Sequence, residues 1–164
     1  MNLIAALAEL KSGDMLAWRG TGFWPGVVRW WTKSEWAHVG MLWWNGSVPV
    51  VLEVTSPSGF QAMAFFVHDL PDAYIHTHLA WTPELQTFAT KEYARASYGR
   101  FDAFLAGIGL QPLSKNRGMQ CAEYVVDVLK KAGWTLPWSP TPVHVIAEIT
   151  KVTGNQLVMI ERQK

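Results

Sequence analysis

The strongest constraint on the fold is a long apolar segment that is interrupted by a turn signal. Residues 36–52 (WAHVGMLWWNGSVPVVL) form the longest stretch without Asp, Glu, Lys or Arg. Asn45 and Gly46 lie inside it, and Asn-Gly between apolar runs is the strongest short-range hairpin signal. With Pro49, this pair argues against a membrane-spanning helix. The segment therefore predicts two antiparallel strands, over residues 36–44 and 48–54, joined by a two-residue turn.

Periodicity and helix-terminus signals predict the elements on either side of this hairpin. The expected elements are a short helix closed by Gly13, a strand over 14–19, a loop and short helix over 20–35, strands over 61–67 and 73–81, helices over 83–98, 101–108, 121–132 and 142–152, and a last strand over 156–160. Strands in a meander with helices segregated from them define an α+β fold. The length of 164 residues predicts a single domain spanning 1–164.

Composition excludes several classes of function. The formal net charge is +1, and Lys and Arg show no cluster, so no nucleic-acid partner is expected. The single cysteine, Cys121, excludes an intramolecular disulfide and a multi-cysteine zinc site. The N-terminal residues lack a basic region before their short apolar run, so we expect no signal peptide, no integral membrane segment and a cytoplasmic location. Ten tryptophans predict a deep core and some aromatic-lined surface.

Three residues suggest nucleophilic catalysis. Cys121 opens the helix expected at 121–132, where free backbone N–H groups and the helix dipole lower a thiol pKa. A lone cysteine is more often an inert packed residue, and His38 in an apolar strand is more often a core residue. If Asn45 and Gly46 form the turn, however, His38 lies directly opposite Glu53, on one face of the hairpin. We expect Cys121 to approach that same face, which would complete a nucleophile, a base and an orienting carboxylate.

These residues and their surroundings resemble the permuted papain-like cysteine hydrolases, namely the YiiX/YaeF-type relatives of the NlpC cell-wall peptidases and of lecithin:retinol acyltransferase. The matching pieces are LKSGDMLAW, TKSEWAHVGM, the glutamate after the hairpin, SYGRFDAF, the helix-opening cysteine and SPTPVHV. They span roughly residues 10–150. The order His38, Glu53, Cys121 is that of the permuted branch.

The resemblance implies a permuted papain-like (NlpC-like) fold, with an antiparallel sheet against which the nucleophile-bearing helix packs. It also implies a cysteine peptidase or amidase that needs no cofactor or metal. In that reading, Cys121 is the nucleophile, His38 the base and Glu53 the third member of the triad. The backbone N–H of Cys121 is the natural first oxyanion donor, with Tyr98 and Asn116 as side-chain candidates. A peptide, a cell-wall peptide or another amide is the expected substrate, and the resemblance is compatible with a bacterial or phage origin.

Three alternatives stay open at this stage, as does the oligomeric state. The same triad could serve a lipid acyltransferase or thioesterase, which the many tryptophans favour. The chain could also be a non-catalytic protein whose aromatic residues bind sugar or peptide. A histidine-based metal hydrolase is the third, because His76 and His78 would share one face of a strand, with His68 nearby. No convincing third ligand accompanies that pair.

Overall fold

We describe the fold from a computed structural model, in which the described residues are 1–20, 26, 29–30, 32–55, 58–92, 120–137 and 141–161. The elements follow the chain in the order α1 (Leu3–Glu9), β1 (Met15–Trp18), β2 (His38–Asn45), β3 (Val48–Thr55), β4 (Gly59–Ala64), β5 (Ala73–Ile75), α3 (Pro83–Thr87), the π-helix η1 (Phe88–Glu92), α5 (Cys121–Lys131), α6 (Pro142–Thr153) and β6 (Val158–Met159).

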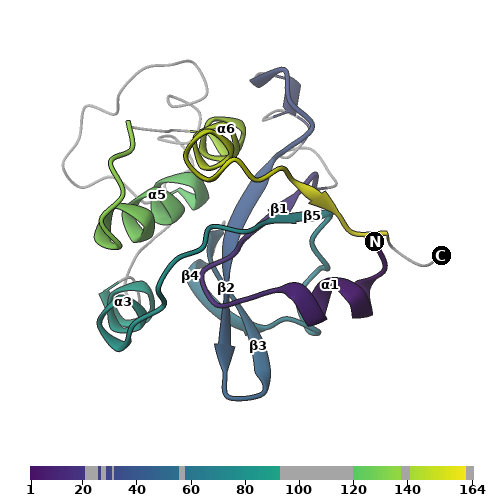
Figure 1. Cartoon of the computed structure of the whole chain (residues 1–164). Helices are drawn as coiled ribbons and strands as arrows, with labels where there is room; N and C mark the ends of the chain where they lie inside the picture. The colour runs from purple at the N-terminus through teal and green to yellow at the C-terminus, as the bar shows by residue number, and fades with distance from the viewer. Residues whose placement is uncertain are drawn as a thin grey trace.

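All six strands belong to one sheet, in the order β4-β3-β2-β1-β5-β6, and each neighbouring pair is antiparallel. The helices α5 and α6 lie on one side of this sheet, whereas α1 lies on the other (Figure 1). This arrangement of one antiparallel sheet between separate helices confirms the mixed, α+β character predicted from the sequence. Within the described part of the chain, no helix is long and apolar enough to span a membrane.

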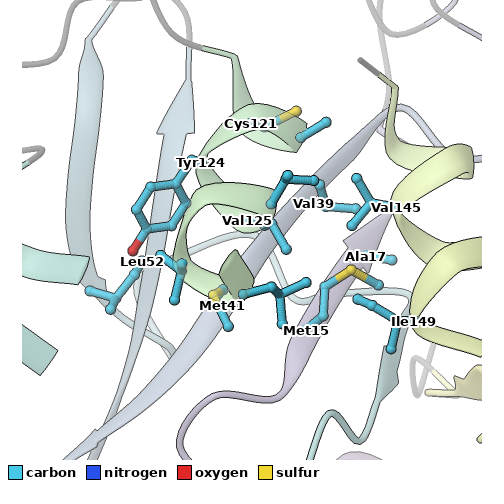
Figure 2. Close-up of a cluster of buried hydrophobic side chains, with 14 of the residues drawn as sticks. Met15, Ala17, Val39, Met41, Leu52, Cys121, Tyr124, Val125, Val145 and Ile149 are labelled. Carbon is cyan, nitrogen blue, oxygen red and sulfur yellow. The ribbon is translucent and has the colours of Figure 1, made fainter. Parts of the chain in front are cut away.

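Each face of the sheet has its own core. Figure 2 shows the larger one, where Tyr124 and Val125 of α5 pack against Val39, Met41 and Leu52 of the central strands. The smaller core lies under α1, and its members are Ala6, Leu10, Leu16, Trp18, Leu42, Val51, Phe65, Tyr74 and Ile160. Successive strand residues alternate between these two cores because side chains alternate along a strand. A residue's parity in β2 or β3 therefore decides which helix layer it faces.

The helix α5 carries the cysteine at its first position. Its start is set by Gln120, whose backbone N–H donates to Glu123 Oε2 at 3.1 Å. Lys130 and Lys131 occupy the last turn, where cations interact favourably with the helix dipole. The chain then leaves the helix through Gly133, which has a φ of +93°. The predicted helix over 121–132 is thus confirmed almost to the residue.

The central hairpin forms as predicted, but its register differs by two residues. Asn45 pairs with Val48, so Gly46 and Ser47 are the central turn residues, in place of Asn45 and Gly46. Gly46 has a φ of +62° at the first central position, where a type II′ turn requires glycine. The prediction that Trp44 faces Ser47 and His38 faces Glu53 is therefore wrong. A two-residue shift nevertheless keeps every side chain on its predicted face, because the side-chain period is two.

Several other elements are shorter than predicted or lie elsewhere. β5 ends at Ile75, and residues 76–82 have no regular structure. The helix expected from Pro83 has one α-helical turn and then continues as η1. Its predicted end over 93–98, and the predicted helix over 101–108, lie outside the described residues.

Candidate active site

Cys121 is positioned by the start of α5 and by an interruption in the sheet. Pairing between β2 and β3 extends only from the turn to Met41 and Leu52, so β3 does not pair with Val39. The backbone N–H groups of Val39 and of Ala122, in the first turn of α5, instead face the Cys121 sulfur closely enough to lower the pKa of its thiol. The cysteine is only 6% exposed. A buried sulfur held by two backbone N–H groups is suited to carry negative charge.

His38 is the first residue of β2 and lies opposite Trp18 of β1. The Trp18 ring packs against the imidazole, with 5.3 Å between centroids. Nε2 of His38 lies 2.5 Å from Glu53 Oε2, and the ring is close enough to Cys121 for each group to change the pKa of the other. Since Nε2 is committed to the carboxylate, Nδ1 is the nitrogen left for the sulfur.

Glu53 reaches His38 diagonally across the hairpin. Extending the register by one pair places Gly40 opposite Glu53, with His38 two residues further along β2. A Cβ on Gly40 would lie 3.0 Å from the Leu52 carbonyl oxygen and 3.3 Å from Glu53 Cβ. The absent side chain therefore leaves the space through which the carboxylate approaches the imidazole.

The predicted meeting of all three groups on one face needs correction. Side-chain alternation along β1, β2 and β3 places Trp18, His38 and Glu53 on the face of the sheet that α1 covers. Cys121 belongs to the core on the opposite face, under α5. Contact is still made because His38 stands at the very start of β2. The site is thus built around the end of a strand, with the cysteine on one side of the sheet and the carboxylate on the other.

The electrostatics of the three groups are mutually reinforcing. Burial by itself lowers the pKa of His38, but the charge of Cys121 and the hydrogen bonds to Cys121 and Glu53 raise it to about 10. Burial by itself raises the pKa of Cys121, yet the charge and hydrogen bond of His38 and the two N–H groups lower it. The arrangement therefore favours a thiolate–imidazolium pair near neutral pH.

Glu53 remains an anion although it is only 2% exposed. Burial raises its pKa, but hydrogen bonds from His38 and then from His68 overcome this effect and lower it to about 2. The second bond joins His68 Nε2 to Glu53 Oε1 at 2.8 Å. This contact was not predicted from the sequence, where His68 is only a neighbour of the His76 and His78 pair. No periodicity could have revealed it, because His68 follows an irregular turn after β4.

The other candidates from the sequence lie away from this site or outside the described residues. His76 and His78 follow β5, with their rings stacked at 6.2 Å. Nδ1 of His76 bonds Asp14 Oδ2 at 2.8 Å, and Asn155 Nδ2 is 2.8 Å from His78 Nε2. Among the described residues, no group of three or more His, Cys, Asp or Glu could hold a metal ion.

The oxyanion candidates Tyr98 and Asn116 lie outside the described residues. Of the tryptophans just before His38, Trp36 is buried, and the Arg19 guanidinium carbon lies 5.5 Å from the centroid of its ring. Trp30 is 76% exposed.

Comparison with solved structures finds the metalloprotein YiiX from Escherichia coli O157:H7, with a TM-score of 0.57 and 18% sequence identity. The match covers 91% of this chain and 88% of that chain. No family model matches the sequence, and neither does any curated protein. The chain thus has a YiiX-like fold, in agreement with the YiiX part of the resemblance seen in the sequence.

Proposed function

We propose that the protein is a cysteine hydrolase of the permuted papain-like type, which cleaves an amide through an acyl-enzyme. The features that support this most directly are the contact of His38 with Glu53 and the mutual effect of Cys121 and His38 on their pKa values. The pKa of the thiol is lowered and that of the imidazole is raised, as an activated nucleophile requires. The order of the three residues along the chain agrees with the permuted branch.

In the proposed reaction, the Cys121 thiolate attacks the amide carbonyl carbon and the carbonyl electron pair moves to oxygen. The backbone N–H of Cys121, at the start of α5, is the oxyanion donor that we assign from the described residues. The intermediate collapses as the His38 imidazolium gives its proton to the departing amine, which leaves a thioester. Neutral His38 then takes a proton from water, and the resulting hydroxide displaces the thiolate and releases a carboxylic acid. Glu53 orients the ring and stabilises its charged form throughout.

The first test is the reactivity of the thiol, which needs no knowledge of the substrate. We expect iodoacetamide to alkylate Cys121 rapidly well below the ordinary cysteine pKa of about 8.5. The rate should fall only when the pH is low enough to protonate the thiolate. Alkylation that follows an ordinary thiol titration would instead favour a non-catalytic binding protein.

The second test separates amide from ester chemistry. Muropeptides and acyl esters or thioesters are incubated with the protein and with Cys121→Ala, and the products are identified by mass spectrometry. Release of a new amine by the native protein, but not by the variant, is the result expected for the amidase.

A thioesterase or acyltransferase with the same triad is the second candidate. Phe66 and Val67 immediately precede His68 and are 65% and 76% exposed. This exposed apolar pair and the ten tryptophans of the sequence favour an apolar acyl substrate over a polar peptide. Turnover of acyl esters without any cleavage of amides would select this candidate.

A further inference from the structure

His68 contacts two groups that can only accept hydrogen bonds. Nε2 lies 2.8 Å from Glu53 Oε1, and Nδ1 lies 2.7 Å from the backbone carbonyl oxygen of Asp69. An ionised carboxylate and a carbonyl have no proton to give. Both contacts are therefore hydrogen bonds only when both ring nitrogens carry protons, that is, when His68 is an imidazolium. A neutral ring would leave one lone pair facing an acceptor oxygen.

Trp18 holds this histidine in place. Its ring packs against both imidazoles, at 5.3 Å from the centroid of His38 and 5.1 Å from that of His68. Its Nε1 donates to the same Asp69 carbonyl oxygen at 2.7 Å. The side chain of His68 is 14% exposed, so its contacts with protein groups outweigh those with solvent. The orientation of the ring is thus set from three sides, by a carboxylate, a carbonyl and an indole.

We propose that His68 is a positioning residue of the site, which as a cation holds Glu53 Oε1 and so keeps Glu53 Oε2 directed at His38. The inference rests on the proposed function and extends its catalytic chain by one residue. From one contacting group to the next, the charges then alternate in sign. The order is the Cys121 thiolate, the His38 imidazolium, the Glu53 carboxylate and the His68 imidazolium. Each buried charge has an opposite charge beside it, which offsets its cost of burial.

The groups acting on His68 agree with this assignment. The hydrogen bond to Glu53 raises its pKa most, burial opposes this, and the Asp69 carbonyl and the charge of Glu53 raise the pKa further. The charge of His38 acts in the opposite direction. The two imidazoliums bond different oxygens of one carboxylate, and the repulsion between them is weaker than the attraction of His68 to Glu53.

The direct test is nitrogen NMR of the native protein labelled with ¹⁵N-histidine, titrated from pH 5 to pH 9. We expect the two ring nitrogens of His68 to keep imidazolium shifts at pH 7, where an unperturbed histidine is largely neutral. A resonance assigned to His68 that shows a neutral ring at pH 6.5 would overturn the proposal. This readout requires neither a substrate nor a mutation, so it cannot fail through misfolding.

The functional test compares His68→Ala and His68→Gln with a matched change of an exposed histidine, His144→Gln on α6. The measured quantity is the rate of Cys121 alkylation as a function of pH. We expect His68→Ala to slow alkylation at pH 5 by about three- to tenfold, because Glu53 loses one of its two donors and His38 its fixed partner. His68→Gln, whose amide can still donate to Glu53, should recover part of the rate, and His144→Gln should leave the profile unchanged.

The outcomes also separate this inference from the proposed function. A native thiol with an ordinary titration would contradict the hydrolase itself. An activated native thiol whose pH profile is the same in His68→Ala would leave the hydrolase intact and overturn the positioning role. A profile displaced to higher pH in His68→Ala, and less so in His68→Gln, supports both.

Discussion

At the scale of single residues, the site depends most on Glu53, because each of its carboxylate oxygens bonds a different imidazole. A glutamine at this position has one acceptor oxygen and one amide donor. It can therefore satisfy one histidine only, and its NH₂ group would face an N–H donor of the other. The site therefore needs the two acceptor oxygens of a carboxylate, one for each histidine, as well as its negative charge.

We predict that Glu53→Gln lowers kcat by about 100-fold or more, with a smaller change in KM. The reason is that the amide stabilises imidazolium formation poorly, whereas substrate binding does not use Glu53. Steady-state kinetics on the substrate found by product analysis would measure both constants. An unchanged kcat would show that Glu53 is not the third member of the triad.

We predict that Cys121→Ala abolishes turnover, by a factor of about 1,000 or more, and leaves the fold intact. Alanine is well tolerated in a helix, and Cys121 occupies the first position of α5. Urea unfolding should therefore remain a single cooperative transition, at a somewhat lower midpoint because His38 loses the thiolate that raises its pKa. Retained turnover would rule out the cysteine mechanism, and a collapsed fold would make the cysteine a structural residue.

The residues that could be found from the sequence were those that conflict with their local pattern. A histidine and a glutamate in apolar strands, and a cysteine at a helix start, each suggested a function beyond packing. His68 offered no such conflict, since it directly follows the predicted strand over 61–67, where a polar loop residue is expected. Its role arises from the irregular turn that brings it back to β3, and no local pattern encodes that path.

At the scale of elements, the hairpin register decides which residues meet. The Asn-Gly signal correctly predicted a two-residue turn, but the prediction placed Asn45 and Gly46 at its centre, where the structure has Gly46 and Ser47. Since Gly46 occupies the first central position, His38 and Glu53 are diagonal and Gly40 is opposite Glu53. The predicted contact survives because glycine leaves the diagonal path open.

We therefore predict that Gly40→Ala impairs the site through packing alone. The added Cβ would lie 3.0 Å from the backbone oxygen of Leu52 and 3.3 Å from Glu53 Cβ, so the strand or the carboxylate has to move. Overpacking of this kind costs about 1–3 kcal/mol. We expect lower unfolding free energy in urea and slower Cys121 alkylation at pH 5.

The matched control is Gly26→Ala, where an added Cβ meets nothing within 4 Å. It should leave both measurements close to native values. If Gly40→Ala also left the alkylation rate unchanged, the diagonal approach of Glu53 to His38 would not depend on this glycine.

At the scale of the whole molecule, the sheet separates the site into two halves, which meet only at the start of β2. Cys121 is held by the α5 layer, whereas Glu53, His68 and Trp18 belong to the side of α1. His38 joins them because it is the first residue of β2. The alternation of apolar residues predicts both layers, but the site at the strand end depends on where pairing between β2 and β3 stops. That point is set by tertiary contacts with α5.

This joining of two halves by ion pairs predicts how the stability of the molecule depends on pH. The pKa of Glu53 falls from an ordinary 4.5 to about 2, so its contribution is present above pH 4.5 and is lost as the pH falls towards 2. The pKa of His38 rises from 6.5 to about 10, so its contribution is present below pH 6.5 and is lost as the pH rises towards 10. Both contributions are complete only between about pH 4.5 and 6.5.

We accordingly predict that the loss of unfolding free energy in Glu53→Gln is greatest near pH 5.5 and smaller at pH 2.5 and pH 9. Urea unfolding of the native protein and the variant at these three pH values measures the difference. The control is Glu35→Gln, which removes an exposed ion pair with Arg19 (56% and 44% exposed) and should have a small effect at each pH. A Glu53→Gln difference that is the same at all three pH values would mean that the carboxylate stabilises the protein by packing, and that the charges of Glu53 and His38 are not coupled to folding.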